Sequence, residues 1–166
     1  MKVLGLILLA LIPTSIGFYR GEELRKILKI QRGFLQLFRE IEEQISLFTR
    51  EQQEIFTKFQ NKSLEDIGFL SHLREEVKKE PCGAIHRSIR AFNLEKYYGE
   101  TQREYIYLVC ERFGMLSREA QLQDLNKLIL LLSKEEDTAK EITDGKIRIA
   151  RTVGMTAGLG LIILLI

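Results

Sequence analysis

Charged residues are absent from both ends of this chain and concentrated in its middle. Residues 3–19 and 152–166 contain no Asp, Glu, Lys or Arg, and all 23 acidic residues lie between them. A helix over the first segment would be about 26 Å long and one over the second about 22 Å, against about 30 Å for the hydrocarbon core of a bilayer. We expect transmembrane helices at residues 1–19 and 152–166, and one helical domain at residues 20–151. Residues 147–150 would help to complete the shorter second span, with the side chains of Arg148 and Arg151 reaching the headgroups.

Basic residues next to the uncharged ends predict the side of the membrane on which the middle lies. Only Lys2 precedes the first segment, and five basic residues follow it: Arg20, Arg25, Lys26, Lys29 and Arg32. Because basic residues remain on the cytoplasmic side, the domain is expected to be cytoplasmic. A cleaved signal peptide is the alternative, with Ser15-Ile16-Gly17 as a small-x-small cleavage site. It would export the domain and leave Arg148 and Arg151 outside, against the same rule.

Apolar residues in the middle recur at helical spacing. From residue 24 to residue 48 they follow alternating steps of three and four: Leu24, Ile27, Gln31, Phe34, Phe38, Ile41, Ile45 and Phe48. This spacing predicts a long first helix, and Leu28 and Leu35 widen the stripe to the width typical of a helix in a bundle. Gln31 is the one polar residue of the stripe and is expected to fix register. No stretch alternates at period two, so we predict an all-α fold.

Turn and cap signals divide the rest of the domain. Ser63 is predicted to cap a helix that ends at Pro81-Cys82-Gly83, and Ala84, Ile85, Ile89 and Phe92 form the next apolar stripe. Thr101 and Glu104 have the spacing of a capping box before a helix over residues 102–113.

The last helix is expected to follow a short turn. Gly114 is predicted to end the preceding helix in a left-handed conformation, and Ser117 to cap the last one. The apolar side of this helix comprises Leu122, Leu125, Ile129 and Leu132. Asp144-Gly145 is a turn-forming pair inside this helix and could act as a hinge.

The sequence offers no constellation for catalysis, metal binding or cofactor binding. His72 and His86 belong to no metal or catalytic motif, and no phosphate-binding glycine loop occurs. Cys82 and Cys110 are interpreted as reduced thiols, with Cys110 in the core. The carboxylate clusters at residues 40–43 and 135–137 are interpreted as solvated helix faces. Basic and acidic residues are interspersed at a net charge of +2, which gives no support for nucleic-acid binding.

Small residues occur at the same depth in both predicted spans. Gly17 and Gly21 form one small-xxx-small pair and Gly154 and Gly158 form another. Such pairs allow close packing of transmembrane helices, although glycine is also frequent in membrane helices without this role.

Three segments of this chain resemble the stage III sporulation protein AB family. They are the apolar start ending in Gly17-Phe18-Tyr19, the segment Phe113-Gly-Met-Leu-Ser-Arg-Glu-Ala-Gln121, and Arg151-Thr-Val-Gly-Met-Thr-Ala-Gly158. The chain departs from the family where Ser117 replaces a frequent Asp and where Thr49-Arg50-Glu51 replaces Thr-Pro-Leu.

The resemblance implies a function in sporulation that the residues alone would not give. It implies a platform or scaffold subunit in the mother-cell membrane, within a channel complex facing the forespore, with a cytoplasmic domain similar to the type II secretion system platform protein F. The implied partners are a secretion-type ATPase, stage III sporulation protein AA, and the other channel subunits; a homo-oligomer stays open. Arg118, Glu119 and Gln121 are the predicted partner-binding residues, because the hairpin itself need not bury them. A membrane-tethered sensor or signalling adaptor is the alternative, and an enzyme is not expected.

Overall fold

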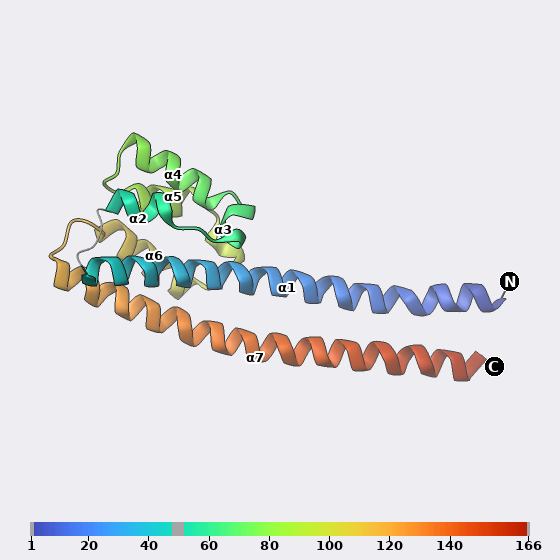
Figure 1. The fold of residues 1–166 in the computed structure, drawn as a ribbon. Helices are drawn as coiled ribbons and strands as arrows, with labels where there is room; N and C mark the ends of the chain where they lie inside the picture. The colour runs from blue at the N-terminus through green and yellow to red at the C-terminus, as the bar shows by residue number, and fades with distance from the viewer. Residues whose placement is uncertain (1, 48–51, 166) are drawn as a thin grey trace. The chain divides into compact units, whose positions relative to one another are not determined.

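The computed structural model consists of helices joined by short turns (Figure 1). It describes the backbone of residues 2–47 and 52–165, and the side chains of residues 22–47 and 54–142 and of positions 145, 149, 152 and 156. In chain order the elements are α1 (Lys2–Leu47), α2 (Gln52–Lys58), α3 (Lys62–Asp66), α4 (Phe69–Lys79), α5 (Ala84–Ala91), the 3-10 helix η1 (Leu94–Lys96), α6 (Glu100–Arg112) and α7 (Arg118–Leu165). The prediction of an all-α fold is confirmed.

The chain divides into two compact units. Residues 27–136 form the helical domain, and residues 1–26 and 137–166 form the other unit. In the second unit α7 stays helical through Asp144 and Gly145, and the hinge at this pair stays a prediction. No helix among the described residues is long and apolar enough to cross a membrane. The predicted spans at residues 1–19 and 152–166 lie almost wholly outside the described side chains and stay a prediction.

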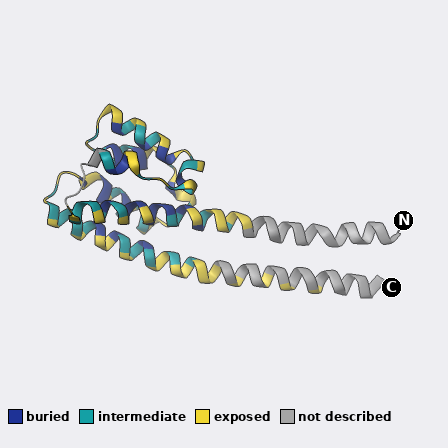
Figure 2. Cartoon of the chain, viewed as in Figure 1, coloured by how far each residue is buried: buried dark blue, intermediate teal, exposed yellow. Residues whose placement is uncertain are grey.

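Aromatic rings form the centre of the helical domain. Phe34 of α1 is fully buried, and its ring centroid lies 4.8 Å from that of Phe69 on α4, in an edge-to-face arrangement. Phe92 and Tyr98 lie 6.1 and 6.2 Å from the same ring. Such pairs are favourable beyond the area that they bury. Figure 2 marks the buried residues of this domain in dark blue.

The predicted stripe of α1 is confirmed in its middle, where Phe34, Phe38 and Ile41 are buried. Its ends are less enclosed, and Phe48 lies outside the described residues. Ile30 and Leu37, outside the stripe, are buried as well. The reason is that neighbours lie on two sides of α1, since Phe34 packs on α4 while Arg39 donates a hydrogen bond to Ser133 of α7 at 3.2 Å.

Gln31 fixes the segment after η1 against α1. Its side-chain nitrogen donates to the carbonyl of Tyr97, and the hydroxyl of Tyr98 donates to the carbonyl of Gln31 at 3.3 Å. These two hydrogen bonds therefore join Gln31 to residues that are 66 and 67 positions later in the chain. Gln31, the polar residue of the stripe, therefore fixes the register of α1 against the segment that follows η1.

Two of the predicted helix starts are wrong. Asn61, and not Ser63, caps α3, because its side-chain oxygen accepts a hydrogen bond from the amide of Leu64 at 3.1 Å. The helix then breaks at Gly68, whose φ of +77° separates α3 from α4. Likewise α6 begins directly after Gly99, so Thr101 lies inside its first turn and the capping box with Glu104 does not form.

Arg87 holds the turn between α4 and α5. Its guanidinium donates to the carboxylate of Glu76 at 2.8 Å, to the carbonyl of Cys82 at 2.9 Å and to the carbonyl of Glu80 at 2.5 Å. Lys79 donates to the same Glu76 carboxylate at 2.8 Å. The predicted break at Pro81-Cys82-Gly83 is confirmed, and a charged side chain from α5 closes it.

The hydrogen bonds to Glu76 predict a loss of stability in acid. Lys79 and Arg87 lower the pKa of Glu76 from 4.5 to about 2. Because the pKa is lower in the folded chain, the carboxylate stabilises the fold above pH 4.5, and this contribution is lost as the pH falls towards 2. Glu76→Gln should therefore flatten the decline of the melting temperature between pH 4.5 and 2, as circular dichroism would measure. Glu75→Gln, at an exposed position of the same helix, is the control and should leave the decline unchanged.

Candidate functional site

The turn between α6 and α7 carries the residues that sequence analysis selected for partner binding. Gly114 has a φ of +85°, as predicted, and the amide of Met115 donates to the carbonyl of Arg112 at 3.1 Å. The hydroxyl of Ser117 accepts a hydrogen bond from the amide of Ala120 at 3.4 Å, so Ser117 caps α7. Both structural residues of the predicted turn are confirmed.

Arg118 is used inside the chain. Its Nε donates to the carbonyl of Ile45 at 2.9 Å, and its guanidinium also donates to the carbonyl of Ser46. These carbonyls belong to the last turn of α1, where the helix itself supplies no partner. The expectation that the hairpin leaves Arg118 free is therefore wrong, because this side chain is half-buried and joins the end of α1 to the start of α7.

Gln121, like Arg118, forms a hydrogen bond inside the chain, whereas Glu119 is exposed to solvent. The side-chain nitrogen of Gln121 donates to the carbonyl of Leu116 at 2.7 Å and so stabilises the turn. Glu119 is exposed in the first turn of α7, where a carboxylate interacts favourably with the helix dipole. Of the three residues predicted to bind a partner, Glu119 is the one whose side chain is exposed to solvent.

Gly114→Val should destabilise the domain by about 2 kcal/mol, because a left-handed backbone is costly for L-residues and more so for a β-branched one. Thermal unfolding followed by circular dichroism would measure the effect. Gly114→Asn is the matched control, since asparagine tolerates this conformation, and it should lose less than half as much. Equal losses for the two variants would mean that the φ of Gly114 is not the cause.

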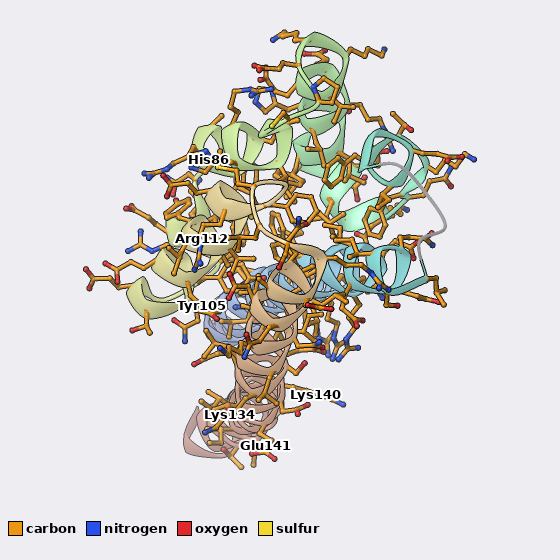
Figure 3. All side chains as sticks on the ribbon, turned by 90° about the vertical axis from the view of Figure 1, so that its left-hand side faces the viewer. His86, Tyr105, Arg112, Lys134, Lys140 and Glu141 are labelled. Atoms are coloured by element: carbon orange, nitrogen blue, oxygen red, sulfur yellow. The ribbon has the colours of Figure 1, made fainter. Side chains whose placement is uncertain are left out.

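The two cysteines of the domain differ in exposure. Burial raises the pKa of the Cys110 thiol and so disfavours its nucleophilic thiolate, whereas Cys82 is exposed. His86, on the surface of α5, lies 3.4 Å from Nε of Arg90 (Figure 3). The described residues contain no group of three His, Cys, Asp or Glu side chains placed to hold a metal ion.

The four glycines predicted to pack transmembrane helices are found in the long helices. Gly17 and Gly21 lie in α1, and Gly154 and Gly158 lie in α7. Their side-chain surroundings are outside the described residues, so their packing stays a prediction.

A sequence model of stage III sporulation protein AB matches residues 2–166. The chain belongs to this family. Its resemblance to stage III sporulation protein AB is thereby confirmed, and membership implies a sporulation-related role among the stage III sporulation proteins. No curated protein and no solved structure matches the chain. The segment from Phe113 to Gln121 that carried the resemblance is, in this member, first a turn that closes the helical domain.

Proposed function

We propose that the chain is a platform subunit of a secretion-like channel complex between mother cell and forespore, without catalytic activity of its own. The observation that carries this proposal is the family match over residues 2–166. Support comes from the helical domain that lies between two uncharged ends of the chain. In this proposal residues 1–19 and 152–166 anchor the chain in the mother-cell membrane and the domain is cytoplasmic, where it resembles the platform protein F of type II secretion systems.

The α6–α7 turn is the proposed contact for the secretion-type ATPase, stage III sporulation protein AA. Arg118 and Gln121 shape the turn through hydrogen bonds to Ile45, Ser46 and Leu116. Glu119 is then held on a fixed backbone with its carboxylate exposed. A preorganised charge is favourable for recognition because little conformational freedom is lost on binding.

Membrane topology is the first test of this proposal. Gln60 is exposed in the loop between α2 and α3, so Gln60→Cys with Cys82→Ser provides one accessible thiol. We expect this thiol to resist a membrane-impermeant maleimide in intact cells and to react after permeabilisation. Labelling of intact cells, or a mature chain that starts at Phe18, would contradict the cytoplasmic placement.

Association with the ATPase is the second test. The full chain in detergent should bind purified stage III sporulation protein AA, and Glu119→Lys should weaken binding about tenfold, equivalent to about 1.4 kcal/mol. Glu75→Lys, at an exposed position of α4, makes the same charge change away from the turn and should leave binding unchanged. Equal binding by both variants would place the contact elsewhere, and no binding by the unmodified chain would favour the signalling-adaptor alternative.

A further inference from the structure

One face of α7 carries no charge in a part of the helix that is otherwise highly charged. Between residues 138 and 156 the charged residues are Lys140, Glu141, Asp144, Lys146, Arg148 and Arg151. None of them lies on the face that follows alternating steps of four and three along α7, which we call the α7 stripe: Thr138, Ile142, Gly145, Ile149, Thr152 and Thr156. All six residues of the stripe are exposed, and the two isoleucines are 50% and 64% exposed.

Gly145, in the middle of the α7 stripe, has open space in front of it. Apart from the backbone of α7 itself, a Cβ at this position would meet no atom of the described chain within 4 Å. Glycine inside a helix is less favourable than alanine, and no contact within the described chain requires it here. On the surface of a helix, however, a small residue allows a second helix to approach closely. The α7 stripe therefore has the shape of a surface that another helix covers.

The spacing of the α7 stripe is that of a coiled coil. Steps of three and four define positions a and d of a heptad, and here Ile142 and Ile149 occupy a, while Gly145 and Thr152 occupy d. A β-branched residue at a is typical of parallel, two-stranded coiled coils. The hydroxyl of Thr156, at the next a position, donates to the carbonyl of Thr152 at 2.9 Å, so this polar group already has a partner within α7.

We propose that the α7 stripe is a homodimer interface, occupied by the α7 stripe of a second copy in parallel orientation and in register. Charge complementarity selects this occupant. In a parallel coiled coil a residue at g lies beside the residue at e of the other helix that is five positions later. Here Glu141 is at g and Lys146 is five positions later at e. The pair forms twice, once on each side of the twofold axis, as an isologous interface requires.

The remaining charges beside the α7 stripe do not oppose this contact. The other two pairs of positions g and e in this stretch each join a basic residue to an uncharged one: Lys134 with Ala139 and Arg148 with Val153. Glu141 and Lys146 of the same copy are not neighbours, because neighbours on a helix surface are three or four residues apart. The complementary pair is therefore available only between two chains.

The parallel orientation also agrees with the proposed membrane anchors, since two copies held in one membrane run in the same direction. That one argument rests on the proposed function, whereas the heptad spacing and the charge pair do not. The stripe is about 27 Å long and consists mainly of small side chains, so it buries less than the 800 Å² or so per partner that is usual in stable complexes. The dimer is therefore weak and is favoured where the effective concentration is high, as in a membrane.

Disulfide cross-linking tests the register of the two helices. In membranes of cells that express the full chain with Cys82→Ser, Ile142→Cys and Ile149→Cys should each give a covalent dimer on oxidation with copper phenanthroline. The reason is that a parallel pair brings identical positions together. Asp137→Cys and Lys140→Cys, exposed at the outer positions c and f, are the controls and should give at least about fivefold less.

Two results would overturn the proposal. Equal yields at all four positions would report random collision and leave the α7 stripe to lipid or to another protein. An antiparallel pair would join position 142 of one copy to position 149 of the other. Low yields for each single variant together with a high yield from a mixture of the two would therefore exclude the parallel register.

Charge exchange tests the pairing between the two copies. Glu141→Lys, added to the Ile149→Cys chain, should lower the dimer yield about fivefold, because it places like charges side by side at both edges of the contact. Adding Lys146→Glu should restore the yield to within about twofold. Lys140→Glu is the control: its side chain points away from α7 in a different direction from Glu141 (Figure 3), and it should leave the yield unchanged.

Circular dichroism of each variant monitors the fold, and none of the exchanged residues takes part in an ion pair found in the described part of the chain. An unchanged yield with Glu141→Lys, or a folded double variant that stays as low as the single one, would contradict the interface.

Discussion

Phe34→Ala should destabilise the helical domain by about 3–5 kcal/mol, the range expected when a large aromatic side chain is removed from a core. The expected loss is large because Phe34 is fully buried and its ring meets Phe69, Phe92 and Tyr98 together. No smaller side chain can keep these three contacts. Urea unfolding followed by far-ultraviolet circular dichroism would measure the change in the free energy of unfolding.

Leu47→Ala is the control for this substitution. Leu47 lies in the last turn of the same helix and is 59% exposed, so its loss should cost about 0.5 kcal/mol or less. Comparable losses at the two positions would mean that the aromatic cluster does not form the centre of the domain.

Arg118→Ala should destabilise the domain by about 2–3 kcal/mol, because hydrogen bonds from a charged donor contribute about 1.5–3 kcal/mol each and the exposed part of the side chain reduces their sum. Two carbonyls at the end of α1 would lose their partner. Arg118→Lys should recover part of the loss, since an ammonium group keeps the charge but not the planar pair of donors. The same urea unfolding experiment measures all three proteins.

Glu119→Ala is the control for Arg118→Ala, because Glu119 is the next residue in the chain and its side chain is exposed. Its carboxylate is exposed, so the expected change is about 0.5 kcal/mol or less. If Arg118→Ala were as mild as Glu119→Ala, the hydrogen bonds to α1 would contribute nothing to stability, and Arg118 would again be a candidate for binding a partner.

The sequence predicted the helices better than their boundaries. Apolar spacing identified α1, α5 and the domain part of α7, because a helix in a bundle must bury one side and that requirement is repeated every turn. Helix starts depend instead on a single side chain. Asn61 and Ser63 lie two positions apart, and both are suitable caps. Asn61 is favoured in the folded chain because its side-chain nitrogen also donates a hydrogen bond to the side-chain oxygen of Gln36 of α1, at 2.7 Å.

The candidate site was predictable only where its interactions are local. Gly114 and Ser117 act within a few residues of themselves, so their roles could be predicted from the sequence. Arg118 acts on carbonyls 72 and 73 residues earlier in the chain, and no local pattern records such a contact.

The pairing of α1 with α7 has a consequence for the synthesis of this protein. Arg32 of α1 binds Glu136 of α7 at 2.5 Å, and 104 residues separate the two in the chain. At about 5–20 residues per second, a ribosome needs roughly 5–20 s to produce that length. During this interval the side of α1 that α7 will cover is made but uncovered, while α2 to α6 can already pack on its other side. The nascent domain therefore passes through a stage in which one side of α1 is still uncovered, and at this stage a chaperone or a neighbouring nascent chain can bind to it.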